Sequence, residues 1–147
     1  MYSALKHSHS GLRWIVLALL IAAIVTAWQA WSKKDSSQSK PGKVVLFALI
    51  FTHIQLLLGL VLYFVSSPYV QFTAGVMKDK LLRFYTVEHL VGMLIAIIVI
   101  TIGYSKGKKQ LPAPEGHKTT FTYYLIGLIL ILISIPWPFR GLAAGWF

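Results

Sequence analysis

A chain of 147 residues that is 56% hydrophobic but only 12% charged cannot cover the surface of a soluble domain, since soluble domains are about 25% charged. The absence of cysteine excludes a disulfide framework and any cysteine-based zinc or redox site. The net charge of +10 is concentrated between the apolar runs, a pattern that favours lipid head groups over nucleic acid. We therefore expect a lipid bilayer as the surroundings and no nucleic-acid partner.

Four apolar runs follow one another along the chain, at residues 11–31, 44–65, 86–104 and 120–137. A helix of about 20 residues crosses the hydrocarbon core of a bilayer, whereas strands of a membrane barrel are about half as long. The sequence therefore predicts an all-α integral membrane protein, with residues 1–147 forming a single four-helix transmembrane bundle. An earlier start of the third helix, near Leu81, stays open.

Two segments at the edges of these runs need an interpretation. The first run resembles a signal peptide, but it is too long for one and three more spans follow, so we expect it to stay in the protein. The longest connection runs from Ser66 to Tyr85, and its residues 72–84 are expected to lie as a short amphipathic piece on the membrane surface.

The basic residues predict the orientation of the bundle. Eight of them lie in the connections 32–43 and 105–119, and six lie on the opposite side. Short loops rich in lysine stay in the cytoplasm, so both termini are expected outside. The eight are Lys33, Lys34, Lys40, Lys43, Lys106, Lys108, Lys109 and Lys118, and the six are Lys6, Arg13, Lys78, Lys80, Arg83 and Arg140.

Ionisable residues inside transmembrane spans are rare and are therefore candidates for function. His9 and Arg13 open the first span on one helix face, His53 lies inside the second, and Glu88 and His89 open the third. Spans one and three run in the same direction, so His9 and His89 are expected at one level near the outer face. Two imidazoles at one level can bind a haem iron from both sides.

Other assignments of these residues stay open. His53 lies about 18 Å from the outer end of its span and is off level with His9, but it would suit His89 if the third helix began near Leu81. Any of the histidines could instead hydrogen-bond a neighbouring helix. Glu88 could cap its helix, orient a ligand or carry protons.

Small residues and arginines complete the expected site. Gly92 and Ala96, which follow His89 at three and seven residues, could leave a groove for a flat macrocycle or could let helices pack closely. Arg13 and Arg140 are both expected on the outer side, where they could pair with haem propionates.

Three stretches carry a resemblance to known proteins: HSGLRWIVLALL (9–20), THIQLLLGLVLYF (52–64) and VEHLVGMLIAIIV (87–99). Together they resemble the short bacterial membrane proteins called cytochrome b. The chain is also distantly similar to one four-helix half of the haem A synthase family, whose Q-x-x-L-G run is matched by Gln55 to Gly59. The resemblance implies a non-covalent haem b and residence in the bacterial inner membrane.

These observations lead to one preferred function and several alternatives. The preferred function is electron transfer by one haem b bound between His9 and His89, with His53 as the substitute ligand, in exchange with a membrane quinone or other respiratory membrane proteins. The sequence gives no catalytic residue, so any enzymatic role would be that of an electron-transfer component of an oxidoreductase. The alternatives are a non-catalytic subunit of a larger complex, a proton-coupled carrier using His53 and Glu88, and a homo-oligomer with haem between protomers.

Overall fold

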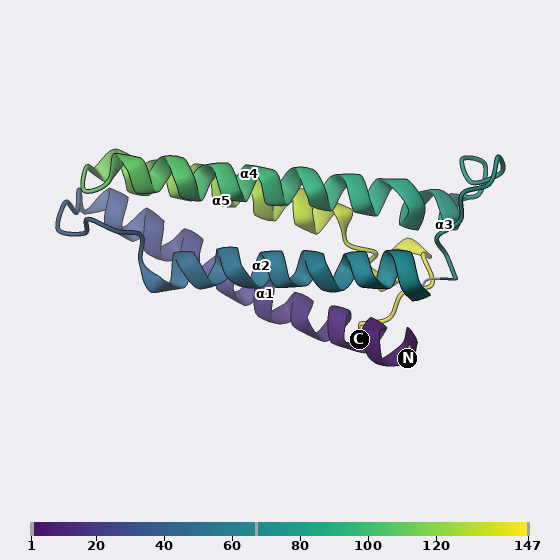
Figure 1. Ribbon diagram of the computed structural model, residues 1–147. Coiled ribbons are helices and arrows are strands. Elements are labelled where there is room, and N and C mark those ends of the chain that lie inside the picture. Colours follow the sequence, from purple (N-terminus) through teal and green to yellow (C-terminus); the bar gives the residue numbers. More distant parts are fainter. Residues whose placement is uncertain (1, 67, 147) are drawn as a thin grey trace.

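A computed structural model describes residues 2–66 and 68–146, and these residues form a bundle of long helices (Figure 1). The second helix continues as the π-helix η1, and the fourth is preceded without a break by α3 and the π-helix η2. The elements are α1 (Tyr2–Ser32), α2 (Lys43–Val61), η1 (Leu62–Ser66), α3 (Lys80–Arg83), η2 (Phe84–Glu88), α4 (His89–Gln110), α5 (Pro114–Ser134) and the 3₁₀ turn η3 (Pro138–Arg140).

The helices alternate in direction, so the two termini and α3 lie at one end of the bundle (Figure 1). We call this the terminal end; the connections 33–42 and 111–113 lie at the other. Helix α1 packs on α2 and α5, and α4 packs closely on α5 and only sparsely on α2. Helices α1 and α4 are therefore diagonal neighbours across the bundle axis.

The outer surface of the bundle is apolar. Four helical segments are long and apolar enough to cross a membrane: Tyr2–Ser32, Lys43–Val65, Lys80–Gln110 and Pro114–Ser134. Large aliphatic side chains along the helices point outward, with Leu57, Ile98 and Ile133 each more than half exposed. Such a surface suits hydrocarbon and not water. The chain is thus an all-α integral membrane protein, as its composition predicts.

Two of the helices extend well beyond the predicted spans at the terminal end. Helix α1 begins at Tyr2 instead of near residue 11, and the third transmembrane segment begins at Lys80. The earlier start near Leu81 is therefore the right alternative. Residues 80–84, expected on the membrane surface, instead continue directly into α4.

Close backbone contact joins α4 to α5. A Cβ atom added to Gly107 would lie 2.9 Å from the carbonyl oxygen of Gly116, and one added to Gly116 would lie 2.7 Å from that of Gly107. Gly92 is likewise covered, by the side chain of Ser134. At Gly92 the small residue therefore serves helix packing, which is the second of the two interpretations offered by the sequence.

Two buried hydroxyls inside the bundle are satisfied by the main chain. Tyr124 is fully buried, and its hydroxyl donates to the carbonyl of Val45 at 3.0 Å. Thr52, also buried, donates to the carbonyl of Ala48. A membrane interior supplies no water for such groups, so these bonds remove a penalty of several kcal/mol that each bare hydroxyl would carry (about 4–8 kcal/mol in hydrocarbon).

Candidate functional site

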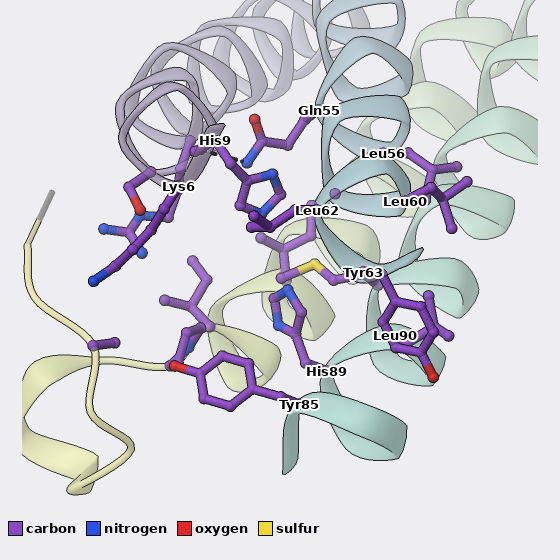
Figure 2. A pocket seen from close by; sticks show the side chains of 18 of the residues that line it. Lys6, His9, Gln55, Leu56, Leu60, Leu62, Tyr63, Tyr85, His89 and Leu90 are labelled. Carbon is purple, nitrogen blue, oxygen red and sulfur yellow. Dashed lines mark hydrogen bonds between the residues drawn. The ribbon is translucent and has the colours of Figure 1, made fainter. Parts of the chain in front are cut away.

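A cavity opens inside the terminal end of the bundle, between the diagonal helices α1 and α4 (Figure 2). Its wall is formed by four helices and by residues 143–145 of the C-terminal segment. His9 comes from α1 and His89 from α4, and both project into it. Most other lining side chains are aliphatic, including Leu56, Leu60 and Leu90.

His89 is oriented by a main-chain hydrogen bond. Its Nδ1 lies 2.8 Å from the carbonyl oxygen of Ser134, at the end of α5. A carbonyl only accepts, so Nδ1 carries the proton and Nε2 keeps its lone pair. Metal-binding histidines are typically oriented in this way, with the second nitrogen donating to a carbonyl or carboxylate.

The π-helix η2 places His89 at this position. The amide of His89 donates to the carbonyl of Phe84, and the carbonyl of Thr86 accepts a bond of 2.8 Å from the Tyr63 hydroxyl on η1. The rings of Phe84 and Tyr85 flank the imidazole, with centroids 5.8 and 6.5 Å away. Single π-helical turns inside α-helices are frequent at functional sites.

His9 is positioned by α2. The side-chain amide of Gln55 donates to the main-chain carbonyl of His9 at 2.8 Å. Gly59 leaves space for the imidazole ring, because a Cβ there would lie 3.0 Å from His9 Cε1. The Nδ1 atom of His9 is buried and has no hydrogen-bond partner among the described residues. The Q-x-x-L-G run from Gln55 to Gly59 thus forms the support of His9.

The two imidazoles lie next to each other in the cavity, in an edge-to-face arrangement. Their ring centroids are 6.3 Å apart and their planes are nearly perpendicular, at 79°. Two imidazoles bound to one metal from opposite sides, each through a bond of about 2 Å, have centroids about 6 Å apart. An edge-to-face ring pair without metal has a similar separation, about 4.5–7 Å.

Helix α1 and the third transmembrane segment both begin earlier than predicted, so His9 and His89 remain at the same level. Measured along its helix, His9 lies about 11 Å from Tyr2 and His89 lies about 14 Å from Lys80. Both residues are therefore deeper in the bundle than the sequence predicted. His53 lies about 20 Å from Ser66 along α2 and does not line the cavity. It contacts the carbonyl of Leu49 and the hydroxyl of Thr101 instead.

The two expected arginine partners are placed differently. Arg13 lines the cavity, is 9% exposed, and donates to the carbonyl of Trp146 at 2.7 Å. Arg140 lies outside the cavity lining and donates to the carbonyls of Ile133 and Ile135 at the end of α5. The last carbonyls of a helix need donors, which explains this position of Arg140.

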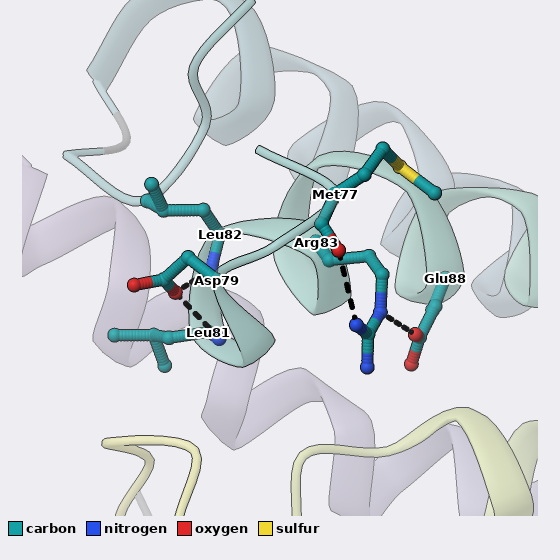
Figure 3. Close-up of polar contacts among 6 residues, drawn as sticks. All are labelled: Met77, Asp79, Leu81, Leu82, Arg83 and Glu88. Carbon is teal, nitrogen blue, oxygen red and sulfur yellow. Dashed lines mark hydrogen bonds and ion pairs between the residues drawn. The ribbon is translucent and has the colours of Figure 1, made fainter. Parts of the chain in front are cut away.

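Glu88 is exposed, and its contact with Arg83 is drawn in Figure 3. Its carboxylate pairs with Arg83 at 2.7 Å and lies apart from His53. The helix cap expected at Glu88 is formed by Asp79, whose carboxylate accepts from the amides of Leu81 and Leu82. Glu88 was offered as a cap for a span that begins at residue 86; the alternative start near Leu81 matches the helix that Asp79 caps.

The two remaining histidines lie outside the cavity. His7 is exposed on α1. His117 is buried near the other end of α5, and its Nε2 atom has no partner in the described part of the chain. Across residues 2–66 and 68–146, no group of three or more His, Cys, Asp or Glu side chains is close enough to hold a metal ion.

The donors therefore suit a metal that brings further ligands of its own, as an iron porphyrin does. The enclosed part of the cavity measures about 150 Å³, a volume that holds a molecule of roughly benzene size. A porphyrin is larger, so it would also need the flexible side chains between α2 and α4, such as Met93, to move aside. These two helices are the adjacent pair with the least mutual contact.

Several residues of the site were not predicted from the sequence. Lys6 lines the cavity one turn before His9, and its spacing from His9 and Arg13 could have revealed it. The carbonyl of Ser134 could not have been found, because a main-chain group gives no sequence signal. Comparison with protein-family models, with curated proteins and with solved structures gave no match.

Proposed function

We propose that the protein is a membrane b-type cytochrome that holds one haem between His9 and His89. The observation that carries the proposal is the pair of imidazoles on diagonal helices, 6.3 Å apart in an apolar cavity. When bound, the haem would supply a reversible one-electron couple. Its partners would be a membrane quinone or other respiratory membrane proteins.

The chain's own residues would fix the two ligands and exclude water. Ser134 keeps the lone pair of His89 on Nε2, and Gly59 admits the ring of His9 beside α2. Aliphatic side chains, leucine and isoleucine among them, make up much of the remaining wall, which keeps the local dielectric low. The lining holds no thiol or carboxylate; besides the two imidazoles it offers the thioether of Met93 and phenols such as that of Tyr85, and we assign the iron to the imidazoles because they form a close pair inside the cavity.

The location of the protein is part of the same proposal. The lysine-rich connections favour a cytoplasmic position for the end opposite the termini. The histidine pair would then lie near the outer face of a bacterial inner membrane. Electron exchange with partners would take place at that side.

The test is the absorption spectrum of the detergent-purified protein, oxidised and then reduced with dithionite. We expect the sharp reduced bands of a six-coordinate b-type haem, at one haem per chain. His9→Ala and His89→Ala should each abolish these bands. The matched control His53→Ala should keep them, because His53 lies outside the cavity lining.

Two outcomes would contradict the proposal. A featureless spectrum after expression in haem-producing cells and addition of haem would exclude a cytochrome, and co-purifying proteins would then favour a non-catalytic subunit. Intact bands in His9→Ala together with their loss in His53→Ala would assign His53 as the ligand in place of His9.

A further inference from the structure

Two cationic side chains flank His9 on the same face of α1. Lys6 lies three residues before it and Arg13 four residues after it, a spacing that puts all three on one helix face. All three line the cavity. Figure 2 shows Lys6 and His9 side by side on this helix.

Among residues 2–66 and 68–146, no acidic side chain pairs with either cation. The chain has four acidic side chains, and none of them lines the cavity. They lie in the connection after α1, at the cap of α3, in an ion pair with Arg83, and in the first turn of α5: Asp35, Asp79, Glu88 and Glu115.

Arg13 is the cation of the two that more strongly requires an opposite charge. Its guanidinium donates a hydrogen bond to the Trp146 carbonyl and lies over the rings of Trp14 and Trp137 at 5.3 and 5.9 Å. Its Nε atom is buried without a partner. A buried charge in a membrane protein is unfavourable unless an opposite charge accompanies it.

We propose that Lys6 and Arg13 form a carboxylate-binding pair, which selects ligands that carry acid groups at one edge of an apolar body. The inference rests on the proposed function. It assigns to Lys6 the role of second carboxylate partner, beside Arg13, which the sequence analysis had given to Arg140. Arginine binds carboxylates through two parallel hydrogen bonds, and lysine adds a mobile point charge. The two propionates of a b-type haem have this chemistry.

The test compares acids with esters. Haem-free protein in detergent is titrated with ferric protoporphyrin and with its dimethyl ester, and also with iron-free protoporphyrin and its dimethyl ester, which do not use the histidines as iron ligands. We expect the wild type to bind each diacid about tenfold or more tightly than its diester. Binding is followed by the Soret band and by porphyrin fluorescence.

The variants separate charge from fold. Lys6→Met should weaken binding of the diacid and remove most of its preference over the diester, whereas Lys6→Arg should keep the preference. The matched control is Lys78→Met, since Lys78 is exposed at the same end and does not line the cavity. Arg13→Gln should act as Lys6→Met does, and the Lys6 variants keep the test valid if Arg13→Gln does not fold.

The possible outcomes distinguish the carboxylate-binding pair from the cytochrome proposal. Equal affinity for acids and esters, with intact bands of histidine-ligated iron, would overturn the carboxylate-binding pair and leave the cytochrome standing. A retained acid preference in Lys6→Met would also overturn it. Loss of the iron bands, with the acid preference of iron-free protoporphyrin retained and sensitive to Lys6→Met, would overturn the cytochrome and support the pair. Absence of all binding would overturn both.

Discussion

At the scale of single residues, the glycine at position 59 gives the His9 imidazole its room beside α2. A Cβ there would lie 3.0 Å from His9 Cε1, so a leucine would displace the ring from the cavity. We expect Gly59→Leu to weaken binding of ferric protoporphyrin by about tenfold or more, equivalent to at least about 1.4 kcal/mol. Titration of the Soret band in detergent measures this change.

Gly11→Leu is the control for this substitution. Gly11 lies on α1 only two residues from His9, yet nothing lies within 4 Å of its added Cβ. This variant should bind haem as the wild type does. Equal affinities for Gly59→Leu and the wild type would mean that His9 does not need its observed position, and would contradict its role as a ligand.

The sequence predicted the two central residues of the site but not all of their surroundings. His9 and His89 could be found because ionisable side chains in an apolar span are conspicuous, and because two helices of the same direction bring their first turns to one level. Arg140 was expected beside them, but its guanidinium satisfies main-chain carbonyls at the end of α5. Which carbonyls need a hydrogen-bond donor depends on the residue at which α5 ends. The sequence predicted that end three residues too late.

At the scale of the elements, the contact of α4 with α5 depends on glycines that face each other. A Cβ on Gly107 would lie 2.9 Å from the Gly116 carbonyl oxygen, which is main chain and cannot turn away. Gly107→Leu should therefore separate the helices and destabilise the bundle by about 1–3 kcal/mol. The midpoint of thermal unfolding in detergent should fall by several degrees.

Thr122→Leu provides the control, because Thr122 is exposed on α5 and a leucine there would face lipid or detergent. Its midpoint should stay near that of the wild type. An unchanged midpoint for Gly107→Leu would show that α4 and α5 do not approach as closely as the structure places them.

Helices were easier to predict than their ends. An apolar run marks the part of a helix that lies in hydrocarbon, but the helix itself continues for as long as hydrogen bonds and caps support it. Tyr2 to Ser10 precede the first apolar run and are helical, and Asp79 caps a helix that begins before the third run. Polar residues that continue a helix carry no hydropathy signal. The positions of these helix ends are therefore determined by local hydrogen bonding.

At the scale of the whole molecule, the chain's charges are divided between the two ends of the bundle. The connections 33–42 and 111–113 lie at the end opposite the termini, and the lysine-rich stretches lie beside them (Figure 1). The cavity opens at the terminal end. The orientation of the bundle therefore decides on which side of the membrane the histidine pair would exchange electrons.

The absence of cysteine makes this orientation directly measurable. Ser39→Cys adds one exposed thiol in the connection between α1 and α2, and Thr73→Cys adds one between η1 and α3, at the opposite end of the bundle. Because lysine-rich loops stay in the cytoplasm, a membrane-impermeant maleimide should label Thr73→Cys in intact cells, and should label Ser39→Cys only after the cells are lysed. The reverse pattern would place both termini and the cavity on the cytoplasmic side, and would leave the four-helix bundle itself unchanged. Labelling of both thiols in intact cells would contradict a bundle that crosses the membrane with its two ends on different sides.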